Sequence, residues 1–122
     1  MSEAVQIYRT GNPTNIHTRT QSVFCAGGGA GDDDWSEGWR FLLKNSGGGD
    51  IVIIRADGVR GRYENWIYND IEKNHFPKVN SVTTIVLESE RDGNNIDVIK
   101  EILNAEMIFF AGGDQSLYLD WI

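Results

Sequence analysis

Cysteine is almost missing from this chain of 122 residues, and Cys25 is the single example. One cysteine excludes a disulfide within the chain and a zinc site built from cysteine ligands. Cys25 itself lies in an apolar stretch, where a thiol is typically buried and inert. The chain also lacks any apolar run that approaches the ~20 residues of a membrane span.

A targeting signal is missing as well. The first residues, Met1–Ala4, do not show the basic and then apolar segments of a secretory signal. We therefore expect a cytoplasmic protein, although a secreted form whose leader has been removed would present the same sequence.

Positive charge is scarce, because 11 lysine and arginine residues face 18 aspartate and glutamate residues, giving a formal net charge of −7. Nucleic-acid binding needs clustered basic side chains that displace counterions. The basic residues here are scattered, so we expect no nucleic-acid partner, and no membrane partner either. The hydrophobic fraction of 40% is that of a globular protein, and the length suits one domain or a piece of one.

Short apolar runs alternate with helical patterns over most of the chain. The runs are typical of buried strands and span residues 23–26, 50–55, 81–87 and 107–111. Apolar residues at helical spacing follow each run, in residues 35–43, 63–71, 96–103 and from Ser116 onward. This alternation predicts an α/β fold with a three-layer, mostly parallel, flavodoxin-like sheet and helices on both faces.

The third of these helices has a clear apolar side. Asn95 precedes it and is its predicted N-cap. We expect its buried face to contain Ile96, Ile99 and Leu103, widened by Val98 and Ile102.

The first 20 residues are organised differently from the rest of the chain. Residues 4–10 alternate apolar and polar side chains, residues 11–14 form a turn cluster, and residues 15–20 alternate weakly. This pattern predicts an N-terminal β-hairpin arm over residues 1–20, followed by an α/β domain over residues 21–122. His17 lies in the arm without a partner nearby in the sequence, so we interpret it as a surface histidine.

Ligands of open parallel sheets bind where the strands end. The loops at those ends are residues 27–31, 55–58, 88–92 and 112–115. The first loop is rich in glycine but departs from the dinucleotide-binding pattern, because the third glycine of that pattern would fall at Asp32. Its glycines Gly28 and Gly29 are instead candidates for the rim of a pocket, together with Asp57 in the second loop.

Three charged features near these loops have structural explanations as well as functional ones. Asp32–Asp34 could hold a hard cation, but adjacent acids do not converge easily on one ion, so a solvated helix start explains them better and we expect no metal site. Arg55 and Asp57 could bind a charged substrate or pair with each other, and the sequence leaves both interpretations open. His75 lies at a predicted helix end, where capping or exposure explains it.

The apolar run Ile108–Ala111 ends abruptly in Gly112, Gly113, Asp114 and Gln115. Two glycines let the backbone turn sharply and approach a ligand closely, and main-chain N–H groups beside a helix N-terminus favour negative charge. One interpretation is an oxyanion site for acyl transfer, with Gln115 orienting the substrate. The other is an ordinary strand-to-helix turn with Asp114 as its N-cap.

The segment Phe109–Gln115 resembles the strand and turn of the cyanophycinase-like serine peptidases. These enzymes are relatives of the aspartyl dipeptidases, and their fold is similar to that of class I glutamine amidotransferases. The resemblance extends upstream through Ala26–Gly29, Ser46–Ala56, Tyr63–Tyr68, Val79–Val82 and Asn104–Glu106. It implies that residues 21–122 are the amino-terminal part of an α/β peptidase domain.

The resemblance also implies hydrolysis of a peptide or isopeptide bond through an acyl-enzyme, without a cofactor. It assigns the oxyanion donor to the Gly113 N–H, the hinge to Gly112 and a substrate contact to Gln115, with Asp114 beside them. The family's serine nucleophile lies downstream of this turn, in an elbow similar to G-T-S-A-G. No serine of this chain has that setting, so we expect the nucleophile, histidine and acid to lie beyond Ile122 and the chain alone to be inactive.

Truncation would also affect assembly. A sheet that ends early leaves the strand at 107–111 without its outer neighbour, which predicts a homo-oligomer or a complementing C-terminal chain. The competing interpretation of the whole sequence is a non-enzymatic flavodoxin-like domain that binds a small anionic ligand at its glycine turns.

Overall fold

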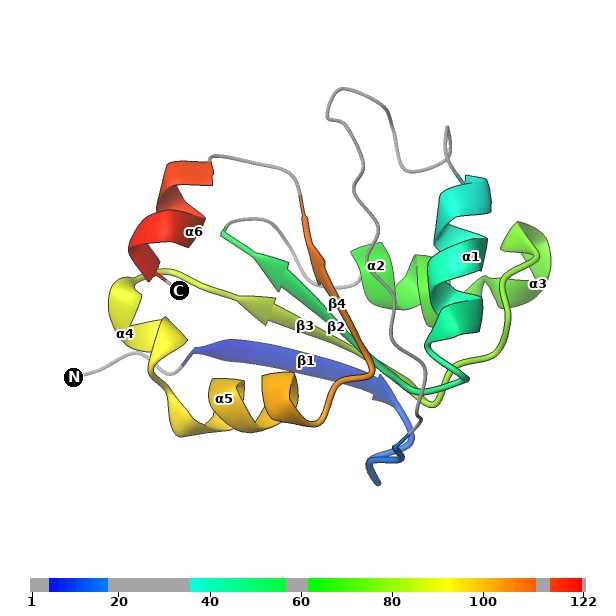
Figure 1. Cartoon of the computed structure of the whole chain (residues 1–122), viewed down its shortest axis with the longest axis horizontal. Coiled ribbons are helices and arrows are strands. Elements are labelled where there is room, and N and C mark those ends of the chain that lie inside the picture. The colour runs from blue at the N-terminus through cyan, green and yellow to red at the C-terminus, as the bar shows by residue number, and fades with distance from the viewer. Residues whose placement is uncertain (1–4, 18–35, 57–61, 112–114, 122) are drawn as a thin grey trace.

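The computed structural model describes residues 5–17, 36–56, 62–111 and 115–121 of the chain (Figure 1). The predicted strand at 23–26 and the glycine loop at 27–31 lie outside this description. The elements in chain order are β1 (Gln6–Gly11), α1 (Ser36–Asn45), β2 (Asp50–Arg55), α2 (Arg62–Glu64), η2 (Asn65–Asn69), α3 (Ile71–Asn74), β3 (Ser81–Val86), α4 (Glu90–Gly93), α5 (Ile96–Leu103), β4 (Met107–Phe110) and α6 (Gln115–Trp121). They form an α/β fold with an open four-stranded sheet.

The strands are ordered β1-β3-β2-β4, and their directions are mixed. β2 lies parallel to both β3 and β4, whereas β1 lies antiparallel to β3. β1 therefore differs from the predicted arm, because it belongs to the main sheet and is the outermost of the described strands on its side. Val5 and Ile7 pack against the apolar cluster beneath α5 and α6, and this burial favours pairing with β3. Residues 15–17, predicted as part of a second arm strand, do not form a strand.

β2 is flanked by a strand on each side, as its apolar sequence predicts. Its first five residues are buried and Arg55 is half-buried. Successive side chains of a strand point to opposite faces, and here both faces meet apolar residues. Ile51 and Ile53 belong to one hydrophobic cluster, and Val52 and Ile54 belong to another. Burial on both sides explains why the strand is continuously apolar.

The first cluster lies on the side of the sheet where Figure 1 shows α1, α2 and α3. Trp39 of α1 is fully buried in it, and the centroid of its ring lies 4.5 Å from that of Phe109 in β4. Leu43 follows Trp39 by four residues and is buried on the same helical face, as predicted from the spacing. After α1, Gly47 and Gly48 adopt positive φ angles of 66° and 77°, which turn the chain toward β2.

The second cluster lies on the opposite side of the sheet, where α5 contributes Val98 and Ile102. The predicted buried face of α5 is therefore wrong in part. Ile96, Ile99 and Leu103 are exposed, at 61%, 37% and 76%, whereas Val98 is 2% exposed. Residues four apart lie in one row along a helix, and the row containing Val98 and Ile102 faces the sheet.

The second predicted helix is broken into the short segments α2, η2 and α3. η2 is a π-helix, in which the N–H of Asp70 donates to the carbonyl oxygen of Asn65, five residues earlier. Asparagine side chains compete for main-chain groups in this segment, and the Asn74 amide donates to the Trp66 carbonyl oxygen at 2.9 Å. The segment closes at His75, which is exposed and has a positive φ of 57°. This confirms the predicted surface position at a helix end.

The starts of α5 and α6 follow the sequence closely. Asn95 caps α5, since its Oδ1 accepts a hydrogen bond from the Asp97 N–H at 2.8 Å. α6 begins at Gln115, immediately before the predicted start at Ser116. None of the helices in the described ranges is both long and apolar enough to cross a membrane.

Candidate functional site

Most residues predicted for the site lie outside the described part of the chain. These residues are Gly28, Gly29, Asp57, Gly112, Gly113 and Asp114. Gln115 is placed only as the first residue of α6. The geometry of the site is therefore given by the described residues that border these loops.

The three parallel strands β2, β3 and β4 end at the same edge of the sheet. β3 is the next strand along the chain after β2, and it lies on one side of β2 in the sheet. The strand after β3 is β4, and it lies on the other side of β2. The winding direction thus reverses between β2 and β4, which makes this the topological switch point of the described sheet. Ala111 donates its N–H to the Ile54 carbonyl oxygen at 3.0 Å. The chain therefore enters the predicted glycine turn directly beside the end of β2.

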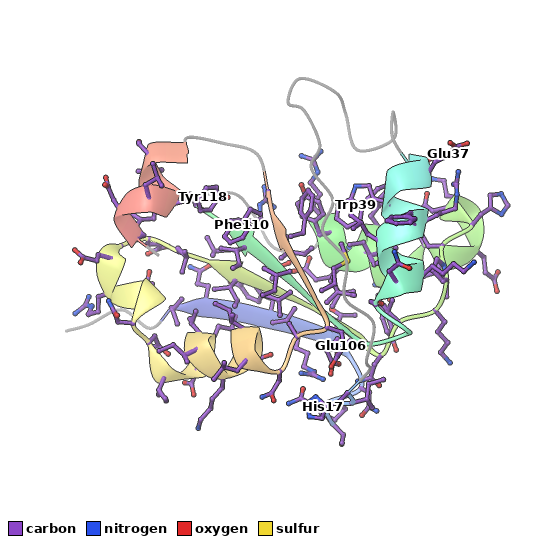
Figure 2. The ribbon with its side chains drawn as sticks, in the orientation of Figure 1. His17, Glu37, Trp39, Glu106, Phe110 and Tyr118 are labelled. Carbon is purple, nitrogen blue, oxygen red and sulfur yellow. The ribbon has the colours of Figure 1, made fainter. Side chains whose placement is uncertain are left out.

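Tyr118 of α6 connects the ends of β2 and β4. Its hydroxyl donates toward two acceptors, the Ala111 carbonyl oxygen at 2.8 Å and the Ile54 carbonyl oxygen at 3.2 Å. Its ring meets Phe110 edge to face, with 5.7 Å between centroids (Figure 2). The residues on both sides of 112–114 are therefore anchored at the switch point.

Two arginines approach one aromatic ring at the end of β2. The Cζ atoms of Arg55 and Arg62 lie 5.4 Å and 5.9 Å from the ring centroid of Tyr63, within cation–π range. Tyr63 is 6% exposed, and its ring centroid lies 5.9 Å from that of Phe109. The sequence leaves open whether Arg55 binds a substrate or pairs with Asp57, and the structure places its guanidinium group over the ring of Tyr63.

The end of β3 is occupied by local hydrogen bonds. Leu87 donates its N–H to the Arg55 carbonyl oxygen at 2.8 Å, which extends the pairing of β3 with β2. The buried Asp92 carboxylate then accepts from the N–H groups of Glu88 at 2.7 Å and Ser89 at 3.2 Å. These bonds close the loop on itself, so it has a structural role at the carboxyl edge.

A buried polar network occupies the opposite edge, where β2 and β3 begin. Asp50 is 3% exposed. Its carboxylate accepts hydrogen bonds from the side chains of Arg9 at 3.1 Å, Asn80 at 2.6 Å and Ser81 at 2.6 Å, and from the Ile16 N–H at 3.0 Å. A buried carboxylate is tolerated when it is paired and hydrogen-bonded in this way. The network ties the N-terminal segment to the sheet.

Glu106, just before β4, belongs to the same network. Its Oε2 accepts from the Asp50 N–H at 2.6 Å, and its own N–H donates to the Asp50 carbonyl oxygen at 2.9 Å. His17 Nδ1 lies 3.4 Å from Glu106 Oε1, and both residues are labelled in Figure 2. The His17 side chain is 71% exposed, which confirms a surface histidine, but its partner is distant in the sequence. We infer that the polar groups at this edge have a structural role, because they connect the N-terminal segment with the starts of β2 and β4.

Two groups, Tyr118 and Asp50, form hydrogen bonds that the sequence pattern does not predict. Tyr118 lies in the helical pattern predicted from Ser116 onward, and a partly buried tyrosine hydroxyl usually finds a hydrogen-bond partner. Asp50 was interpreted only as the first residue of a strand. An aspartate beside a run that is buried on both faces needs partners, and this was the signal for the network.

Comparison of the chain with known protein families, with curated proteins and with solved structures gives no match. Within the described ranges, no group of three or more histidine, cysteine, aspartate or glutamate side chains is arranged to hold a metal ion. The features that bear on function are therefore the geometry of the carboxyl edge and the sequences of its loops.

Proposed function

We propose that this chain is the amino-terminal part of a serine-type peptidase similar to the cyanophycinase-like enzymes, with their three-layer, flavodoxin-like arrangement. In this proposal the chain supplies the oxyanion and substrate-binding wall. The observation that supports it most is the position of Ala111, which β4 brings to the switch point beside β2. The sequence Gly112–Gln115 follows there, where open α/β sheets bind their ligands.

The proposed chemistry is stabilisation of negative charge during acyl transfer. The Gly113 N–H donates to the carbonyl oxygen of the scissile peptide or isopeptide bond as charge develops on that oxygen. Removal of one such donor costs about 3–4 kcal/mol of transition-state stabilisation in enzymes of this kind. Gly112 permits the close approach of the main chain, Asp114 borders the turn, and Gln115 contacts the substrate.

The proposed nucleophile belongs to polypeptide outside these 122 residues. Two described serines already have structural partners near the opposite edge. Ser46 Oγ donates to the Leu43 carbonyl oxygen at 2.6 Å, and Ser81 Oγ donates to Asp50 at 2.6 Å. Ser116 is exposed on α6 and lacks the G-x-S-x-G setting of a strained elbow.

Labelling with a fluorophosphonate tests the class of enzyme directly. The full-length gene product and the 122-residue chain are treated side by side, and the adduct is located by mass spectrometry. We expect one labelled serine, within a G-x-S-x-G elbow, in the full-length protein and none in the shorter chain. A folded full-length protein that takes no label would remove the peptidase proposal.

A pair of substitutions at Gly113 tests the oxyanion donor in the full-length protein. Gly113→Pro removes the N–H, whereas Gly113→Ala keeps it and is the matched control. We expect Gly113→Pro to lower kcat by about 10²–10³-fold, and Gly113→Ala to lower it much less. Circular dichroism of both variants checks the fold. Equal losses of kcat in two folded variants would contradict a role for this N–H.

The side of β4 that faces away from β2 supports a proposal about assembly. Among the described strands, β4 pairs only with β2, and its Ile108 and Phe110 are 41% and 52% exposed. A strand edge without a neighbour is a template for another strand. We propose that it pairs with a second copy or with a complementing C-terminal chain. Light scattering that shows the 122-residue chain as a monomer at every concentration would contradict this.

A non-enzymatic flavodoxin-like domain that binds a small anionic ligand is the competing function. The specific observation in its favour is the pair of arginines beside Tyr63 at the end of β2. The fluorophosphonate result separates the two, because a binding domain contains no activated serine.

A further inference from the structure

The two connections between the described parallel strands lie on opposite faces of the sheet (Figure 1). Between β2 and β3 the chain forms α2, η2 and α3, whose Tyr63 and Ile67 belong to the first cluster. Between β3 and β4 it forms α4 and α5, and Val98 of α5 belongs to the second cluster. The two connections also run in opposite directions, because β3 and β4 lie on opposite sides of β2. Since both the face and the direction are reversed, the two crossovers have the same hand, as expected when both are right-handed.

The chain leaves β4 on the face that α5 covers. Tyr118 and Trp121 of α6 pack against the second cluster, to which α5 also contributes. A crossover on this face with the same hand as the one from β3 to β4 runs in the same direction across the sheet. It therefore leads to the side of β4 that faces away from β2. Among the described strands, β4 has no neighbour on that side.

The helices on this face cover β2 more completely than β4. Val52 and Ile54 of β2 are 1% and 2% exposed, whereas Ile108 and Phe110, which lie beside them in register, are 41% and 52% exposed. Phe110 meets Tyr118 of α6, and the alternation of side chains along a strand places Ile108 on the same face. Burial of these two apolar side chains by a further element of this layer would be favourable.

We propose that α6 begins a right-handed crossover to a further strand, which pairs in parallel with the outer side of β4, and that this crossover covers Ile108 and Phe110. The inference rests on the proposed function in one respect, since both place polypeptide after Ile122. A parallel strand in this position ends at the same edge of the sheet as β4, where the proposed oxyanion turn follows. A serine elbow at the end of that strand would therefore lie beside the Gly113 N–H.

Photo-cross-linking in the full-length gene product tests the pairing. Two variants, Ile108→p-benzoylphenylalanine and Phe110→p-benzoylphenylalanine, are irradiated, and the linked peptides are identified by mass spectrometry. We expect links within one chain to a single apolar run after Ile122. Position 110 should reach a later residue of that run than position 108, because the strands are parallel. Phe41→p-benzoylphenylalanine is the matched control and should not reach the run, since Phe41 is 51% exposed on α1, which packs on the other face.

Hydrogen exchange of the unmodified full-length protein gives a second measurement. Ala111 donates its N–H to β2, and successive N–H groups of a strand point to opposite sides, so the Phe110 N–H points to the outer side. When a strand pairs there, the two amides should exchange within about tenfold of each other.

Five results would overturn the proposal: much faster exchange at Phe110, links between two chains, links only to residues 1–122 (the apolar run 23–26 included), a reversed order of the linked residues, or no link in either folded variant. The labelling experiment is independent of all five. A paired β4 in a protein that takes no label removes only the peptidase, and a labelled serine in a protein with an unpaired β4 removes only the crossover.

Discussion

The two edges of the parallel strands carry different kinds of polar group. At the edge where β2 and β3 begin, the buried Asp50 carboxylate accepts hydrogen bonds from three side chains and one main-chain N–H. At the edge where the strands end, the Tyr118 hydroxyl meets two carbonyl oxygens. The arginines beside Tyr63 lie at this same edge, bordering the segment that follows β2.

This difference distinguishes the polar groups that hold distant parts of the fold together from those that border the predicted binding loops. At the first edge, the donors and acceptors around Asp50 come from distant parts of the described chain and satisfy one another. At the second edge, the described groups anchor the ends of loops whose sequences predict binding. Open α/β sheets bind their ligands at the second kind of edge, because the strand ends and the loops there form a crevice.

The largest change in the free energy of unfolding is expected at the edge where β2 and β3 begin. Asp50→Ala removes the acceptor of four hydrogen bonds and leaves Arg9 without its closest charged partner. Breaking a buried ion pair from one side typically costs about 3–5 kcal/mol of the free energy of unfolding. Urea denaturation followed by circular dichroism measures this cost. It is a large share of the roughly 5–15 kcal/mol that stabilises a typical domain.

Asp120→Ala is the control for Asp50→Ala, because Asp120 is an exposed aspartate on α6. Its replacement should change the free energy of unfolding by less than about 0.5 kcal/mol. Similar small changes in both variants would show that the hydrogen-bond network around Asp50 does not stabilise the fold.

A smaller change in the free energy of unfolding is expected at the edge where the parallel strands end. Tyr118→Phe removes the hydroxyl that meets Ala111 and Ile54 and keeps the ring that packs on Phe110. The loss of one hydrogen-bonding group should lower the free energy of unfolding by about 1 kcal/mol. Hydrogen exchange should become faster at the Ala111 amide, which measures opening of this strand end. Unchanged protection of that amide would contradict the anchoring role of Tyr118.

The sequence predicted much of the fold because local patterns decide much of it. The apolar run of β2 requires cover on both sides, and Asn95 provides the cap that α5 needs. Trp39 and Leu43 at helical spacing were correctly placed on one buried face. In each case, the pattern that predicted the structure lies within a short stretch of neighbouring residues.

The errors at β1, Asp50 and Tyr118 have a common physical origin, because each depended on contacts between distant segments. β1 joins β3 across a long stretch of chain, and no pattern within the first 20 residues specifies that partner. The Asp50 network likewise unites Arg9 with Asn80. The location of a site at the carboxyl edge could be predicted from the strand ends and the glycines that follow them. The hydrogen bonds of Tyr118 could not, because they depend on how α6 packs against the sheet.

The smallest effect is expected on α5, away from the polar groups of either edge. Leu103 is 76% exposed although it was predicted to be buried, so Leu103→Ala should change the free energy of unfolding by less than about 0.5 kcal/mol. Val98→Ala is the matched variant on the same helix, since Val98 is 2% exposed and should lose about 2 kcal/mol. Both values come from urea denaturation of dilute samples. A large loss in Leu103→Ala that grows with protein concentration would mean that a second copy covers this helix, and burial within one chain would then no longer explain the difference between Leu103 and Val98.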